Sequence, residues 1–173
     1  MPKLIKDASI VEDEWQFIEF EADKQQNTLP AGKIILPLDI YLAQADQASS
    51  RQQEIGVWIN GDEYLNKLTS HLSTIPLIAV RFPGFMDGRS FSTGRLLRDR
   101  YQFGGELRAI GSFIRDQLCY LNRCGFNAFS FALSPDAEKE EANLESALNS
   151  LNDFQEYYQA SSNQPLPLFR RRA

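Results

Sequence analysis

The sequence has one histidine, His71, and two cysteines, Cys119 and Cys124, among its 173 residues. A single histidine with no nearby triad partners gives little support to Ser-His-Asp or Cys-His catalysis. Two cysteines cannot supply a four-thiolate zinc or iron–sulfur site, and their spacing differs from the Cys-x-x-Cys redox motif. They lie on different faces of a predicted helix, so we interpret them as buried, reduced thiols. The sequence therefore does not predict the commonest nucleophilic, metal or thiol-redox centres.

Long hydrophobic runs and excess positive charge are also lacking. The longest apolar runs, such as 76–80, are far shorter than the roughly 20 residues that span a bilayer. The first residues lack the apolar core of a secretory signal. The net charge of −5 argues against general nucleic-acid binding. We expect a cytoplasmic protein that binds neither membranes nor nucleic acid, while its oligomeric state stays open.

Hydrophobic patterning predicts an α/β fold of about four parallel β/α units with an N-terminal β-hairpin extension. Strands are predicted at 33–37, 55–59, 76–82, 106–110 and 127–133, and helices at 38–45, 63–72, 90–101, 112–123 and 134–159. Strands that alternate with helices imply parallel crossovers. An open sheet and a half-barrel share this pattern, so both alternatives remain.

The same pattern divides the chain into a single α/β domain, residues 1–160, and a flexible basic tail, residues 161–173. Within the domain, residues 1–32 are predicted to form the β extension, with Ile10 to Phe20 as the hairpin. Residues 55–133 form the β/α core. Residues 134–160 form an acidic helix with seven acids and one lysine.

Arginine is concentrated in the middle of the chain. Residues 81–123 contain eight arginines, no lysine and four acids. Planar guanidinium groups suit bidentate recognition of oxyanions and carboxylates. The alternative is internal ion pairing, for example between Arg95 and Asp99, which lie one helical turn apart. The segment is therefore a candidate for anion or partner binding, with ion-pair scaffolding as the competing interpretation.

A loop with two glycines, residues 83–92, follows the strand at 76–82 and leads into the N-terminus of the next helix. Ligands of parallel α/β sheets bind beyond the carboxyl ends of strands, where this loop lies. Backbone N–H groups of the helix start, together with Arg89, are suited to an anion. The loop matches neither the Walker nor the Rossmann pattern. The candidate ligand- or partner-binding residues are Arg81, Asp87, Gly88, Arg89, Ser92, Arg95, Arg98, Glu106, Arg108, Asp116, Gln117 and Arg123.

Several phrases in and beyond this segment resemble a bacterial family of unknown function, domain of unknown function 934. They are Arg81-Phe-Pro-Gly-Phe-Met-Asp-Gly-Arg-Ser-Phe-Ser, Leu96-Leu-Arg, Gly105-Glu-Leu-Arg-Ala-Ile-Gly, Asp116-Gln-Leu and Arg123-Cys-Gly-Phe. The resemblance covers nearly the whole chain and is densest over 81–131. Ser90 departs from the family, which often has glycine there. Members are commonly labelled as oxidoreductases of sulfite reduction, so the resemblance implies that pathway but no established catalytic residues.

Three functional hypotheses follow. The first is an accessory protein of assimilatory sulfite reduction that binds sulfite reductase, another sulfate-assimilation enzyme, or a small oxyanion, and carries no cofactor. The second is a flavin- or phosphate-ligand-dependent oxidoreductase on a half-barrel-like fold, with Asp87 or Asp116 as the proton carrier. The third is a structural subunit whose arginines only make ion pairs.

Overall fold

The computed structural model describes residues 2–18, 29–45, 50–51, 53–84, 86–131, 137–151, 153–154 and 156–171. The strands within them form one sheet in the order β2-β1-β8-β7-β6-β5-β4-β3. They are β1 (Lys3–Lys6), β2 (Ser9–Glu12), β3 (Gln16–Phe17), β4 (Ile34–Pro37), β5 (Ile55–Asn60), β6 (Leu77–Phe82), β7 (Glu106–Gly111) and β8 (Ala128–Ser130). The helices are α1 (Leu38–Ala43), η1 (Leu65–Leu68), α3 (Arg89–Asp99), η2 (Arg115–Gln117), α4 (Leu118–Arg123), α5 (Ala137–Ser150) and α6 (Leu168–Arg171).

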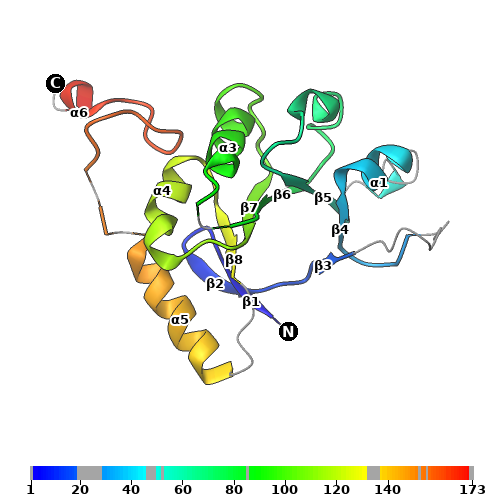
Figure 1. Cartoon of the computed structure of the whole chain (residues 1–173), viewed down its shortest axis with the longest axis horizontal. Coiled ribbons are helices and arrows are strands. Elements are labelled where there is room, and N and C mark those ends of the chain that lie inside the picture. Colours follow the sequence, from blue (N-terminus) through cyan, green and yellow to red (C-terminus); the bar gives the residue numbers. More distant parts are fainter. Residues whose placement is uncertain are drawn as a thin grey trace.

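Strands β3 to β8 are parallel, and each lies beside the next one along the chain. This sequential order requires each crossover to return on the same side of the sheet. Figure 1 shows the result, an arch of strands with α1, α3 and α4 on its convex side. The predicted α/β fold is confirmed, and of the two open alternatives the structure has the half-barrel.

The alternation of side chains along the strands builds two unequal cores. On β6, Ile78 and Val80 point to the helices and belong to the large outer cluster. Leu77 and Ala79 point to the concave face and belong to a smaller cluster with Ile35. All five side chains are buried. The main core therefore lies between sheet and helices, while a short apolar patch lines the inside of the arch.

The N-terminal hairpin extends the sheet beyond β8. Strands β1 and β2 pair antiparallel around Asp7 and Ala8, whose φ angles of 48° and 57° make the tight turn. Strand β1 also pairs antiparallel with β8. The prediction of an N-terminal hairpin is confirmed, but its predicted position is wrong. Residues 3–12 form the hairpin, rather than residues 10–20. Phe20 lies outside the described residues.

A short link, residues 13–15, joins the two opposite edge strands, β2 and β3. Four Cα steps reach at most about 15 Å, whereas eight strands in a flat sheet would separate these edges by roughly 34 Å. The sheet must therefore curl. Figure 1 shows the link passing beneath the arch, where Trp15 packs against the inner apolar cluster. The N-terminal chain thus covers part of the concave face.

Several predicted boundaries are wrong in length. The helix predicted at 63–72 is reduced to the short 3₁₀ helix η1, where the hydroxyls of Thr69 and Thr74 bond to carbonyls three residues earlier and compete with the helical pattern. The helix predicted at 112–123 begins only at Arg115, as η2 followed by α4. The last strand ends at Ser130, and the acidic helix at Ser150 rather than 159.

Candidate functional site

Arg108, one of the candidate residues, lies inside the arch and is almost fully buried. Its guanidinium donates from Nη1 to Asp13 Oδ2 at 2.8 Å and from Nε to Glu106 Oε1 at 2.8 Å. Lys6 forms a further ion pair with Glu106 at 2.7 Å. Asp13 belongs to the link beneath the arch, so Arg108 and Glu106 anchor that link. Their charges are neutralised within the fold.

The Arg98 side chain bonds mainly to backbone carbonyls in the helix layer. Its guanidinium donates to the carbonyls of Phe103, Gly105 and Gly125 and to Asn127 Oδ1. Burial lowers the pKa of this arginine. Gly125, with a φ of 97°, leaves room for the Arg98 stem. We therefore assign Arg98 to the C-terminal caps around it, and not to a ligand.

The loop after β6 forms an ion cluster at the start of α3. Arg89 donates from Nη2 to Asp87 Oδ2 at 2.6 Å and from Nη1 to Asp62 Oδ2 at 3.1 Å. Hydrogen bonds from the side chain and backbone of Arg89 lower the pKa of Asp87 to about 2. Gly88 is the residue before α3. The anion that the sequence predicts for Arg89 is thus replaced by the chain's own carboxylates.

The remaining candidates outside a pocket are Arg81, Asp116 and Gln117. Arg81 lies at the carboxyl end of β6 on the concave face, with its guanidinium 5.8 Å from the ring centre of Trp58. Asp116 is exposed and close to Arg115. The side chain of Gln117 accepts the backbone N–H of Ile114 and so closes the start of η2. These three residues do not converge on one site.

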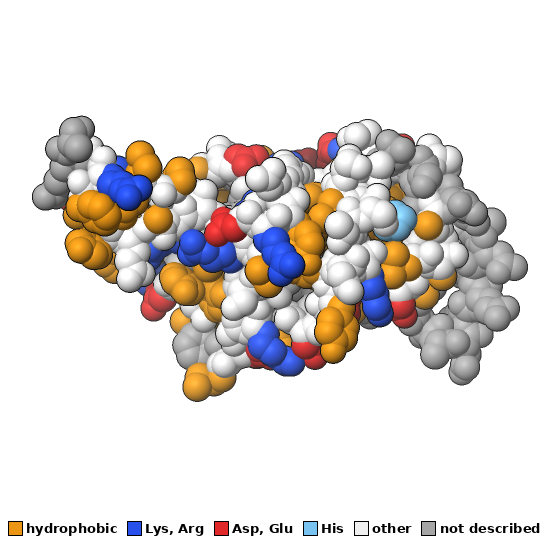
Figure 2. Space-filling view, turned by 90° about the horizontal axis from the view of Figure 1, so that it is seen from above, with side chains coloured by type: hydrophobic (Ala, Val, Ile, Leu, Met, Phe, Trp, Pro, Cys, Tyr) orange, Lys and Arg blue, Asp and Glu red, His pale blue; other side chains and the backbone are white. Residues whose placement is uncertain are grey.

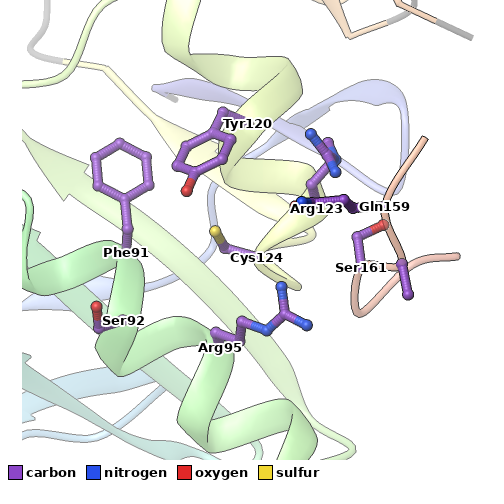
Figure 3. A pocket seen from close by; sticks show the side chains of 9 residues that line it. Phe91, Ser92, Arg95, Tyr120, Arg123, Cys124, Gln159 and Ser161 are labelled. Carbon is purple, nitrogen blue, oxygen red and sulfur yellow. The ribbon is translucent and has the colours of Figure 1, made fainter. Parts of the chain in front are cut away.

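Three candidates, Ser92, Arg95 and Arg123, meet in a pocket of about 170 Å³ between α3 and α4. Its remaining wall is residues 159–161, from the segment after α5. Figure 3 shows these side chains around one space, with the Arg95 guanidinium directed towards the C-terminal segment. None of the nine lining residues is acidic. We call it the two-arginine pocket.

Arg123 occupies the pocket with part of its hydrogen-bonding capacity unused. Its guanidinium lies over the ring of Tyr157, 4.1 Å from the centroid. Its Nε is buried and has no hydrogen-bond partner among the described residues. A buried donor without a partner is costly, so the ring contact is the main support of this side chain. Arg123 therefore lines the pocket as a cation held against an aromatic ring.

Arg95 is held from the opposite side. Its Nε donates to Asp99 Oδ2 at 2.8 Å, the helical pair expected from the spacing. The Asp99 carboxylate accepts a hydrogen bond from Arg95 Nε, which orients the arginine without occupying all of its guanidinium donors. Figure 3 places Arg95 and Arg123 on different elements on either side of the pocket. Two arginines in a lining that has no acidic residue favour a negatively charged ligand.

Tyr120 of α4 and Cys124, the residue after α4, complete this wall. Cys124 is a free and buried thiol, and burial raises its pKa. Figure 3 shows the Cys124 sulfur and the Tyr120 hydroxyl on the pocket side of α4. The Tyr120 ring packs on Phe91 with centroids 5.1 Å apart. At neutral pH the thiol is therefore a neutral lining group, and the pocket keeps its positive charge.

The sequence analysis missed the C-terminal contribution to the pocket. Gln159 and Ser161 line it, although they follow the acidic helix by several residues and carry no motif. Only their contact with α4 in space reveals them. Among the described residues, no group of three or more histidines, cysteines and acids is arranged to hold a metal ion. In the same part of the chain, no helix has the length and apolar character needed to cross a membrane.

Comparison with known proteins identifies a family. The model of a family described as "Bacterial protein of unknown function (DUF934)" matches residues 56–169. The matched range contains α3, α4 and the residues that line the two-arginine pocket. No curated protein matches the chain.

Proposed function

The chain belongs to the bacterial protein family of unknown function DUF934, and from this premise we propose that it is an oxyanion-binding accessory protein of assimilatory sulfite reduction. We assign the pathway because members of this family are commonly labelled as oxidoreductases of sulfite reduction. The binding activity rests on the two-arginine pocket. The ligand class is a small, doubly or singly charged oxyanion such as sulfite or sulfate.

The convergence of Arg95 and Arg123 on one pocket whose lining residues include no acid is the observation that carries this proposal. The guanidinium groups at Arg89, Arg98 and Arg108 already bond to carboxylates or carbonyls of the chain. An oxyanion in the two-arginine pocket would accept hydrogen bonds from both walls. The pocket volume of about 170 Å³ suits a small anion and is too small for a dinucleotide.

The lining residues favour binding over catalysis. A general base is needed near a reacting group, and the pocket has no carboxylate or histidine in its lining. Cys124 is the obvious nucleophile, but its raised pKa keeps it protonated at neutral pH. Together with the positive charge, these features support a protein that holds an anion rather than one that transforms it.

Calorimetric titration of the full-length chain with sulfite, sulfate and phosphate tests the proposal. Replacing Arg123 by methionine removes charge-assisted hydrogen bonds worth about 1.5–3 kcal/mol each, so affinity should fall about 10- to 100-fold. Arg115→Met is the matched control, because Arg115 is exposed and pairs with Asp116 away from the pocket. Failure of the wild-type chain to bind any of the three anions refutes the binding activity.

A growth assay tests the pathway separately. Deletion of the gene should prevent growth on sulfate and on sulfite, with rescue by sulfide or cysteine. Complementation with Arg123→Met should fail, whereas Arg115→Met should restore growth. Normal growth of the deletion strain on every sulfur source removes the pathway assignment and leaves the anion site to be explained in another pathway.

A further inference from the structure

The segment after α5 contacts the residues that position both pocket arginines. We call residues 157–162 the C-terminal strap. At one end, the Tyr157 ring lies under the Arg123 guanidinium. At the other end, the Ser162 hydroxyl donates to Asp99 Oδ1 at 2.6 Å, and Asp99 holds Arg95. The strap residues between these two ends, 159–161, line the pocket.

The backbone of the strap is tied to Arg123 as well. The Ser162 N–H donates to the Arg123 carbonyl at 3.1 Å. Arg123 therefore contacts the strap twice, through its carbonyl and through its guanidinium. A change in the position of the strap necessarily changes the surroundings of this arginine.

Tyr157 is itself held from both sides. Its hydroxyl and the Cys119 sulfur of α4 are 2.7 Å apart, and its carbonyl accepts a hydrogen bond from Arg171. Burial and the contact with Cys119 raise the pKa of Tyr157 to about 12, so the phenol stays neutral. The ring is thus a fixed platform against α4, and the arginine stacked on it has restricted freedom.

We propose that the C-terminal strap is an integral wall of the oxyanion site and that Tyr157 is the positioning residue for Arg123. This inference rests on the proposed function, because it assigns a role in oxyanion binding. It also has a thermodynamic consequence. Strap docking and anion binding act on the same arginine, so if the docked strap strengthens anion binding, the anion strengthens strap docking by the same factor.

The test measures sulfate affinity of the full-length chain by calorimetry in four variants. Tyr157→Leu removes the aromatic face, and loss of a cation–π contact of about 0.5–2 kcal/mol predicts an affinity about 2- to 30-fold lower. Tyr157→Phe keeps the ring and should retain nearly wild-type affinity. Tyr64→Leu changes an exposed tyrosine outside both the strap and the two-arginine pocket and should have no effect. Ser162→Ala acts on the Asp99 and Arg95 side and should weaken binding.

Hydrogen exchange at the Ser162 amide provides a readout that a purely structural role would not change. Sulfate should slow this exchange in the wild-type chain and in Tyr157→Phe, but not in Tyr157→Leu. Circular dichroism checks that each variant folds, and Ser162→Ala decides the matter if Tyr157→Leu does not. If Tyr157→Leu folds and binds sulfate with wild-type affinity, the role of the strap is overturned while the proposed function stays intact. If only Ser162→Ala folds, wild-type affinity in Ser162→Ala has the same meaning. Absence of sulfate, sulfite and phosphate binding by the wild-type chain overturns both.

Discussion

Replacing Arg108 by methionine should destabilise the protein strongly, because it removes the partner of two buried carboxylates. Asp13 and Glu106 have side chains only 6% and 7% exposed, and Arg108 is 1% exposed. Glu106 keeps its contact with Lys6, whereas Asp13 loses its ion pair. Breaking a buried pair on one side costs about 3–5 kcal/mol. For a chain of this size, that loss lowers the melting temperature by roughly 6–20 °C.

Urea unfolding followed by tryptophan fluorescence measures this loss directly. Both tryptophans, Trp15 and Trp58, pack against the inner cluster and report on the same face as Arg108. Arg89→Met is the matched control, because the Arg89 pairs are exposed and screened by solvent. It should leave the urea midpoint nearly unchanged.

A double-mutant cycle with Asp13→Asn isolates the interaction. Asparagine at position 13 carries no charge, so it is not left as an unpaired buried ion when Arg108 is replaced. The double variant should therefore recover part of the stability lost in Arg108→Met, with a coupling of about 0.5–3 kcal/mol. A loss below about 1 kcal/mol for Arg108→Met, or coupling near zero, would show that the cluster does not hold the link to the sheet.

Three further predictions concern other positions. Gly125→Ala should destabilise by about 1–3 kcal/mol in urea unfolding, since its φ is 97° and a Cβ would lie 2.3 Å from Arg98 Cγ, whereas Gly104→Ala meets nothing and should be neutral. Glu63→Gln should stabilise the protein at pH 7 but little at pH 4. Burial raises the pKa of Glu63 in the folded state, so the wild-type fold loses stability as the pH rises from the unfolded-state pKa of Glu63 through its folded-state pKa. An equal gain at both pH values contradicts that account. Alkylation of Cys124 should need a higher pH than alkylation of an ordinary exposed thiol, because burial raises its pKa, and sulfate should slow the reaction further; mass spectrometry of the modified peptide measures both.

The parallel β/α order was predictable from local patterns, but the curvature was not. Continuous apolar runs such as 76–82 indicate strands covered on both faces, and β6 confirms this one. The half-barrel depends on the short link at 13–15 and on the ion pair from Asp13 to Arg108, whose partners are 95 residues apart. No periodicity in the sequence encodes a contact at that separation.

The candidate site was predictable only in part for a similar reason. The pair of Arg95 and Asp99 follows from helical spacing, and the structure confirms it. The concentration of arginines pointed to this region as a candidate, yet most of its guanidinium groups bond within the chain. On the face drawn in Figure 2, Lys and Arg side chains lie in separate groups among acidic and hydrophobic ones. The partners that distinguish Arg123, namely Tyr157 and Ser162, follow α5 in sequence and reach it only after the chain turns back towards α4.

The link beneath the arch also has a consequence for the order of folding. The first strand pairs with β8, at Ile5 and Phe129, and the link is anchored on β7 through Arg108. During synthesis the N-terminal hairpin therefore has no docking site until most of the chain has left the ribosome. Contacts this distant in sequence slow folding, because a long loop must close before they form. Residues 3–12 should be among the last to become protected from hydrogen exchange.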